Sequence, residues 1–217
     1  MITMQTLSSR DEWLERRKGK IGGSDAASIV GVSPWKSNVQ LYREKIWEAD
    51  PGDISDSPAV VYGVKAEPLL RDLFILDHPQ MAVNYEEWNS WENTRYPWAL
   101  ASLDGWLIDD RNRNGILEIK TATIRTSAQR KEWDGRIPDH YYVQVLHYMM
   151  VMEADFAVLR ACIRREGAEG FAGADIRDYW IERAECLEDI QILETEEELF
   201  FRKIQNREEP ALRLPDV

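Results

Sequence analysis

The chain has 217 residues, of which 44% are hydrophobic and 30% are charged, and its formal net charge is −12. This length and composition fit a single globular domain over residues 1–217 with a core of its own. No apolar run approaches the ~20 residues that span a bilayer, and the first residues lack the apolar stretch of a secretory signal. We therefore expect a cytoplasmic protein. The net charge argues against a simple basic nucleic-acid binder, because contacts to phosphates require cations.

Charge is distributed unevenly along the chain. The segment 16–20 is basic, the segment 125–136 holds four cations against two anions, and residues 182–198 are rich in Glu and Asp. A local basic groove on an acidic body would reconcile this distribution with an anionic substrate. The two cysteines, Cys162 and Cys186, are too few for a four-thiolate zinc or iron–sulfur site. We expect them to be free, partly buried thiols, since a reducing cytosol disfavours a disulfide.

Hydrophobic periodicity predicts four helices in the first third of the chain. They cover residues 10–18, 24–30, 37–48 and 59–76. Ser24 is the expected N-cap of the second helix because it follows a Gly-Gly turn, and Gly31 with Pro34 ends that helix.

Short segments rich in β-branched and aromatic residues predict strands in the middle of the chain. Their ranges are 81–88, 95–101, 103–109 and 115–121, arranged as an antiparallel meander. A helix at 139–153, strands at 156–164 and 175–182, and a long helix at 186–206 complete the chain. This order predicts an α/β (α+β) fold with a mixed central β-sheet flanked by helices.

The strongest chemical signal is a pair of carboxylates and an ammonium on two neighbouring predicted strands. Side chains alternate along a strand, so Glu118 and Lys120 share one face while Leu117 and Ile119 point into a core. A hairpin between the strands would place Asp104 beside Glu118, at a sheet edge or bend.

Such a group suits the hydrolysis of a phosphodiester. The carboxylates of Asp104 and Glu118 are hard oxygen ligands of the kind Mg²⁺ prefers, and the backbone carbonyl of Ile119 is a candidate third ligand. A bound metal would lower the pKa of a water and offset charge on the phosphate. Lys120 could hold or deprotonate that water, or stabilise the pentavalent phosphorus. The alternative is a solvent-facing ion pair on a strand edge, because Glu-x-Lys alone is common.

The pattern Asp104…Glu118-Ile119-Lys120 resembles the D…(D/E)-x-K core of the restriction-endonuclease-like nucleases. Further blocks extend the resemblance in order over nearly the whole chain. They are residues 17–27, 31–36, 63–68, 101–105, 117–121, 137–145 and 200–201. Together they resemble the YqaJ-like viral recombinases, the phage lambda exonuclease family. Leu103 stands where the wider superfamily often has proline, a departure that removes no ligand.

The resemblance implies roles for residues at the expected centre. Asp104 and Glu118, with the Ile119 carbonyl, match metal ligands for Mg²⁺ or Mn²⁺, and Lys120 matches the catalytic lysine. Glu67 matches a further acidic residue, which would orient a metal-bound water or help to hold a second ion. By pattern alone, Glu67 is an ordinary carboxylate on a helix surface.

Arg17, Ser24 and Gln144 match positions that grip phosphate near the cleaved end in this family. A helix N-terminus favours an anion near Ser24, and Arg17 can clamp phosphate at two points. The sequence pattern alone fits a phosphate-binding Gln144 and an exposed polar residue on its helix equally well. Lys36 follows a Ser-Pro-Trp turn and is a candidate contact to the DNA backbone or to the separating end. The alternative is an ordinary solvated lysine in a loop.

The family implies a 5′→3′ exonuclease of linear double-stranded DNA that leaves 3′ single strands for recombination. It also implies a phage or prophage origin in a bacterial host, a single-strand-annealing partner protein, and a homo-oligomer such as the ring-shaped trimer known in the family. One alternative is an endonuclease or structure-specific nuclease on the same core. Another is a catalytically silent DNA-binding recombination subunit, which would gain little from carboxylates clustered against phosphate.

Overall fold

A five-stranded mixed sheet forms the centre of the fold in the computed structural model, which describes residues 1–49, 52–167 and 170–214. The strand order is β2 (Ala82–Asn84), β4 (Gly105–Ile108), β5 (Asn114–Ile124), β6 (Phe156–Gly167) and β7 (Gly170–Glu182). β5 and β6 are parallel, and the other neighbouring pairs are antiparallel. The expected mixed central sheet is confirmed.

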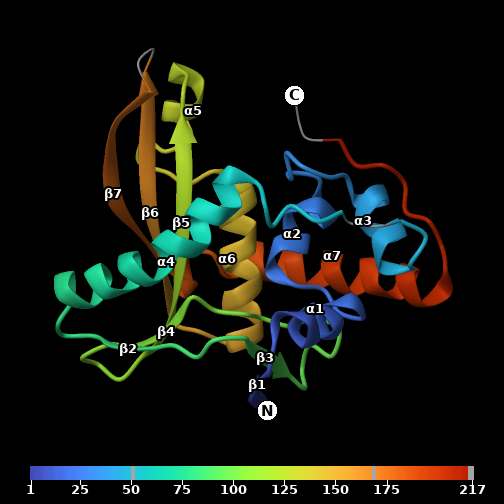
Figure 1. Ribbon diagram of the computed structural model, residues 1–217. Helices are drawn as coiled ribbons and strands as arrows, with labels where there is room; N and C mark the ends of the chain where they lie inside the picture. Colours follow the sequence, from blue (N-terminus) through green and yellow to red (C-terminus); the bar gives the residue numbers. More distant parts are fainter. Residues whose placement is uncertain (50–51, 168–169, 215–217) are drawn as a thin grey trace.

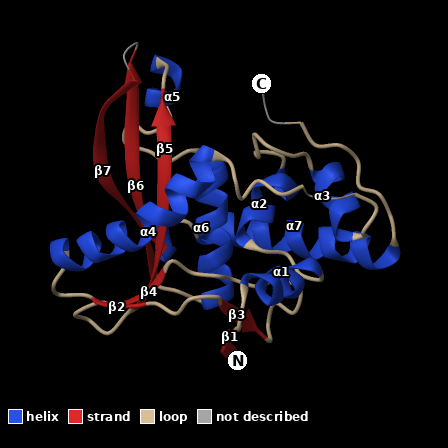
Figure 2. Ribbon diagram, viewed as in Figure 1, coloured by secondary structure: helices blue, strands red, loops and turns tan. Residues whose placement is uncertain are grey.

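Helices flank this sheet and continue to one side of it (Figure 1, Figure 2). The helices are α1 (Arg10–Lys18), α2 (Gly23–Val30), α3 (Asn38–Lys45), α4 (Pro58–Asp77), α5 (Ser127–Lys131), α6 (Asp139–Met152) and α7 (Leu187–Asn206), with a short 3-10 turn at Arg183–Glu185. A separate two-stranded ribbon pairs β1 (Ile2–Thr6) with β3 (Asn89–Asn93). Among the described residues, no helix is long and apolar enough to cross a membrane.

Alternation along the strands gives the sheet two apolar faces, and each is covered. One face packs with α2, α6 and α7 through a large cluster that includes Ile116, Leu159 and Val145. The other face carries Leu117 and Ile119, which join the inward residues of α4 in a smaller cluster. The result is a three-layer α/β/α arrangement, as expected for a sheet that is hydrophobic on both sides.

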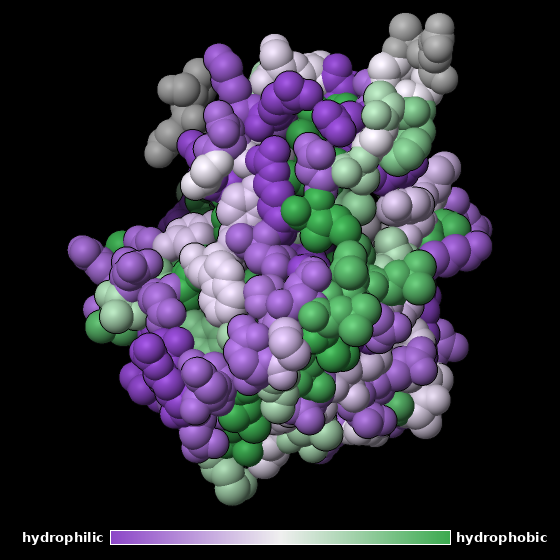
Figure 3. Space-filling view, turned by 90° about the vertical axis from the view of Figure 1, so that its left-hand side faces the viewer, coloured by the Kyte–Doolittle hydropathy of each residue, from purple (hydrophilic) through white to green (hydrophobic). Residues whose placement is uncertain are grey.

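Helix α4 also presents apolar side chains outward. Leu70 and Phe74 are buried beneath it, whereas Val64, Leu69 and Leu76 are exposed. Figure 3 faces the side toward which the C-terminal end of α4 points and shows a band of hydrophobic side chains on a largely hydrophilic surface. The single chain therefore leaves part of the apolar surface of α4 in contact with solvent.

The predicted helices match closely, but the predicted strands need correction. Segment 95–101 is not a strand: Tyr96 and residues 98–101 are buried in an irregular path held by single bridges at Ala99 and Ala101, whereas Arg95 and Pro97 are exposed. Burial of the apolar residues explains the composition of the segment without strand pairing. The strand of this region is β3, which lies earlier and pairs with the chain's first residues, and α5 was not predicted. Cys162 and Cys186 are free and buried, as expected.

Gly115 provides a test of how closely β5 and β6 pack. A Cβ atom at this position would lie 2.3 Å from the Phe156 ring. We expect Gly115→Ala to lower the free energy of unfolding by about 2 kcal/mol through overpacking. Urea denaturation measures this change. Gly19→Ala is the control, because its Cβ would have no atom within 4 Å among the described residues, and equal stability of the two variants would contradict the close packing.

Candidate active site

The candidate site begins where β4 and β5 separate. β4 pairs with residues 114–117 of β5, whereas β6 pairs with 115–124, so beyond Leu117 one edge of β5 is free of β4. Asp104 directly precedes β4, one step beyond the pair Gly105–Leu117. Its Oδ2 accepts a hydrogen bond from the backbone N–H of Ile119 at 2.8 Å. The Asp104 carboxylate thus binds a backbone N–H of β5 that a neighbouring strand would otherwise bind. It lies beside Glu118, at the bend that the sequence predicts.

Glu118 is buried on the face of β5 toward α6. Its Oε1 lies 2.6 Å from Nζ of Lys120 and accepts a hydrogen bond of 2.8 Å from Nε2 of Gln144. The same Gln144 nitrogen lies 3.0 Å from the hydroxyl oxygen of Tyr148, one turn further along α6. The shared face of Glu118 and Lys120 is therefore confirmed, and α6 holds the carboxylate in place.

Helix α4 brings Glu67 to the opposite side of the site. The Arg71 guanidinium is bonded to the Glu67 carboxylate, and its Nε donates to the backbone carbonyl of Asp104 at 2.6 Å. The Tyr85 ring lies against the same guanidinium, 3.4 Å from Cζ to the ring centre. Arg71 therefore joins α4 to the loop that carries Asp104. The i, i+4 spacing of Glu67 and Arg71 is the sequence signal that would have revealed this arginine.

Burial and mutual repulsion make the carboxylates difficult to ionise. Burial, followed by the charge of Asp104, raises the pKa of Glu67 to about 7 and that of Glu118 to about 8. Burial also raises the pKa of Asp104 above its ordinary value. Burial lowers the pKa of Lys120, but the charges of Glu118 and Asp104 outweigh this effect and raise it above its ordinary value. Lys120 is therefore protonated at neutral pH.

The donor set fits a hard divalent cation. Oε2 of Glu118 is buried and has no hydrogen-bond partner among the described residues. Carboxylates with raised pKa values are those that a cation would most stabilise. No group of three or more His, Cys, Asp or Glu side chains in the described part of the chain could hold a metal by itself. Two carboxylates would therefore need the Ile119 carbonyl and water to complete the shell, which suits Mg²⁺ because it usually keeps several waters.

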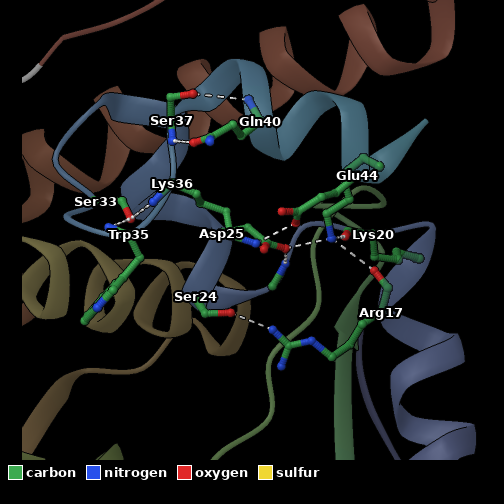
Figure 4. Close-up of polar contacts among 12 residues, drawn as sticks. Arg17, Lys20, Ser24, Asp25, Ser33, Trp35, Lys36, Ser37, Gln40 and Glu44 are labelled. Carbon is green, nitrogen blue, oxygen red and sulfur yellow. Dashed lines mark hydrogen bonds and ion pairs between the residues drawn. The ribbon is translucent and has the colours of Figure 1, made fainter. Parts of the chain in front are cut away.

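The start of α2 differs from its prediction. The N-cap is Gly22, not Ser24, and the backbone N–H of Gly22 donates to Oδ2 of Asp25 at 3.0 Å. Asp25 is buried and also lies 2.7 Å from Nζ of Lys45 (Figure 4). Burial raises the pKa of Asp25, but Lys45 and Arg17 outweigh it and hold that pKa below its ordinary value. Asp25 caps the helix from inside, which leaves Ser24 in its first turn.

Ser24 instead meets Arg17, as Figure 4 shows. The guanidinium donates to the Ser24 hydroxyl at 2.7 Å and lies over the Trp13 ring, 4.4 Å from its centre. This pair adjoins the carboxylates through Tyr148. A Cβ atom on Gly23 would lie 2.4 Å from the Tyr148 ring, so the ring packs directly against the start of α2. Burial and the charge of Glu118 raise the pKa of Tyr148 above its ordinary value, although Lys120 and Arg17 lower it.

The structure therefore brings most predicted site residues together. Glu118 contacts both Lys120 and Gln144 directly, and Asp104 binds the backbone N–H of Ile119, between Glu118 and Lys120. Arg71 joins Glu67 to Asp104. Gln144 is buried against Glu118 and is not on an exposed helix face. Lys36 is separate from these contacts: its Nζ lies 2.5 Å from Glu44. Tyr148 was not predicted, although it lies four residues after Gln144 on the same helix face.

The mixed α/β fold is the one that the resemblance to restriction-endonuclease-like nucleases implies, and Asp104, Glu118 and Lys120 lie together at one bend of its sheet. The chain belongs to the YqaJ-like viral recombinase family, because the model of the YqaJ-like viral recombinase domain matches residues 12–155. The uncharacterized protein YqaJ of Bacillus subtilis (strain 168) is 36% identical over 180 residues, which cover 73% of this chain and 49% of that protein. The chain thus spans about half the length of this curated relative.

Solved structures share the fold at low sequence identity. The alkaline exonuclease LHK-Exo from Laribacter hongkongensis is 20% identical with a TM-score of 0.67, over 92% of this chain and 94% of that one. A second structure of LHK-Exo, in complex with dAMP, gives a TM-score of 0.66 at 18% identity with the same coverage. A phage-related exonuclease from Haemophilus somnus 129PT gives 0.56 at 13% identity, over 87% and 96% of the two chains.

The raised pKa of Glu118 predicts a pH-dependent stability. Its pKa of about 8 exceeds the ordinary value of 4.5, so at neutral pH the folded protein holds a proton that the unfolded chain has released. The stability contributed by this site is complete below the unfolded pKa and is lost as the pH rises toward 8. In metal-free buffer, we expect wild-type protein to lose up to about 1.4 kcal/mol per pH unit relative to Glu118→Gln.

Urea unfolding in EDTA between about pH 6.5 and pH 8 measures this difference, because that window lies between the ordinary pKa of Glu118, 4.5, and its folded value of about 8. Parallel pH profiles for the wild type and Glu118→Gln would show that Glu118 is ionised in the folded protein.

Proposed function

We propose that this chain is a metal-dependent deoxyribonuclease that digests linear double-stranded DNA from its ends. The observation that carries the proposal is the group of the half-buried Asp104 and Lys120 with the buried Glu118, in which one Glu118 oxygen has no hydrogen-bond partner among the described residues. Two proteins with the same fold, an alkaline exonuclease and a phage-related exonuclease, support the same reaction class.

In the proposed reaction, Asp104, Glu118 and the Ile119 carbonyl would hold Mg²⁺ or Mn²⁺. When bound there, such an ion would lower the pKa of a water and add positive charge beside the scissile phosphate. Lys120 acts as a hydrogen-bond donor because it is protonated, and it stabilises the charge that develops on the phosphate. Gln144 orients the Glu118 carboxylate, and Glu67 orients the attacking water from α4.

Phosphate binding is proposed at the start of α2. Ser24 lies in the first turn of that helix, where backbone N–H groups favour an anion, and Arg17 already donates to its hydroxyl. A phosphate would take over some of these donors and gain a charge-assisted pair with the guanidinium. Lys36 would contact the DNA backbone by exchanging Glu44 for a phosphate.

The remaining parts of the proposal follow the family. Digestion would run 5′→3′ and leave 3′ single strands, which a single-strand-annealing partner would receive. A homo-oligomer, such as a trimeric ring, would keep the enzyme on its substrate. The exposed apolar residues of α4, including Leu69 and Leu76, support assembly because an isolated chain leaves them in water.

The first test is digestion of end-labelled linear duplex DNA beside a closed circle, with Mg²⁺ and with EDTA. We expect Mg²⁺-dependent loss of the linear DNA alone, beginning at the 5′ ends. Cutting of the circle would identify an endonuclease on the same core. Absence of cleavage with both Mg²⁺ and Mn²⁺ would instead support a silent DNA-binding subunit.

Lys120→Met tests the chemistry of the site while keeping the length of the side chain. Loss of one preorganised donor should lower kcat by about 10²–10³-fold. Gel-based rates at saturating DNA measure this loss, and circular dichroism checks the fold. Lys203→Met on α7 is the control, since Lys203 pairs with Glu208 and contacts none of the proposed site residues in the described structure. A kcat for Lys120→Met within twofold of wild type would remove Lys120 from the mechanism.

A further inference from the structure

Trp35 is a large aromatic residue with no role in the site described so far. It lies between α2 and α3, and 69% of its surface is exposed. Exposure of an indole leaves a large apolar area in water, which folded proteins usually bury or use in binding. The exposed indole is therefore available for binding outside the single chain.

The loop that carries Trp35 is well defined by hydrogen bonds. Ser33 Oγ accepts from the backbone N–H groups of Trp35 and Lys36, at 3.3 and 3.4 Å. Directly afterwards, Ser37 and Gln40 cap the start of α3 reciprocally. Figure 4 shows that the indole points away from this cap and toward α6. The ring is thus presented in a fixed direction, which reduces the entropy lost on binding.

Contacts with α6 place this ring beside the proposed catalytic centre. The Trp35 ring meets His140 edge-on at 4.7 Å between ring centres and lies 6.3 Å from Tyr141. Nζ of Lys120 lies 5.1 Å from the Tyr141 ring centre. The Tyr141 ring therefore lies close to both Trp35 and Lys120. A few nucleotides cover the distance between Trp35 and Lys120, because each adds about 3.4 Å along a duplex strand.

The two α6 rings beside Trp35 are uncharged at neutral pH. Burial and the charge of Lys120 lower the pKa of His140 to about 4, so this imidazole is neutral at neutral pH. Trp35, His140 and Tyr141 then form an uncharged aromatic row that leads from the surface to Lys120. Such a row suits the flat face of a base better than it suits a phosphate, because phosphate requires donors or cations.

We propose that Trp35 is a stacking platform for an unpaired DNA base next to the phosphodiester that the site cleaves. A base inside a duplex is already stacked on its neighbours. We therefore expect the indole to stack on a base that is terminal or displaced from the duplex. Stacking on an aromatic side chain tolerates every base, because each has a π-face. This inference rests on the proposed nuclease function and adds to it a contact with the base, beyond the phosphate and metal contacts.

Kinetics with natural and abasic ends test the proposal. The substrates are linear duplexes whose terminal nucleotides carry either bases or abasic sugars. Base stacking contributes about 1–3 kcal/mol by alanine substitution, so Trp35→Ala should lower kcat/KM on natural ends by about tenfold or more. On abasic ends, Trp35→Ala should match the wild type, and Trp35→Phe should recover most of the activity on natural ends.

A second readout is the Kd for the same DNA, measured by fluorescence anisotropy in EDTA, where Trp35→Ala should weaken binding to natural ends alone. Trp47→Ala is the matched control, because Trp47 is 66% exposed and lies against Lys18 instead of α6. We expect this control to behave as wild type on both substrates.

Unchanged kcat/KM and Kd for Trp35→Ala on natural ends would overturn the proposal. An equal loss on natural and abasic ends would also overturn it, since the contact would not be to a base. A change in oligomeric state on size-exclusion chromatography, with the same loss on both substrates, would assign Trp35 to a subunit interface. If wild-type protein neither binds nor cleaves DNA, the proposed function itself fails, an outcome separate from these.

Discussion

The repulsion between the half-buried Asp104 and the buried Glu118 is the constraint on which the rest of the site depends. Burial raises the pKa of Asp104, directly before β4, and that of Glu118, on β5, and the charge of Asp104 raises the pKa of Glu118 further. Folding tolerates them because Lys120 lies 2.6 Å from Glu118 and the Ile119 N–H binds Asp104 at 2.8 Å. A stable core would gain more from apolar residues at these positions. The cation that we propose for this site would explain why the two carboxylates lie so close together.

Two helices approach this pair from opposite sides. On each helix, two polar side chains four residues apart are bonded to each other and to the site. From α4, Arg71 connects Glu67 to the Asp104 carbonyl. From α6, Gln144 lies between Glu118 and Tyr148. Tyr148 then packs so closely on Gly23 that no larger residue fits there without displacement. The first turn of α2 is thus in contact with the carboxylate site, which couples the proposed phosphate position to the proposed metal position.

Local patterns were sufficient for the helices other than the short α5 and for the central hairpin, because amphipathic periodicity and a tight turn are properties of neighbouring residues. They placed Asp104 beside Glu118 correctly. Pairing between distant segments left no such signal: β1 joins β3 with Ile2 opposite Asn93. The N-cap of α2 was misplaced because Asp25, inside the helix, binds Gly22 and is itself neutralised by Lys45. The family pattern identified Gln144, but only the fold shows that it contacts Glu118.

The net charge of −12 makes Arg17 especially informative. The basic segment 16–20 offers less free charge than its sequence suggests, since Arg16 and Lys20 both pair with Glu92 and Lys18 pairs with Glu15. Arg17, in contrast, donates to a hydroxyl and lies on an indole ring. An acidic protein that acts on DNA must obtain its affinity from such local donors and from bound metal, because its overall field repels the substrate. In the proposed nuclease, contacts to the terminal phosphate and base would therefore supply recognition and would favour DNA ends over uninterrupted duplex.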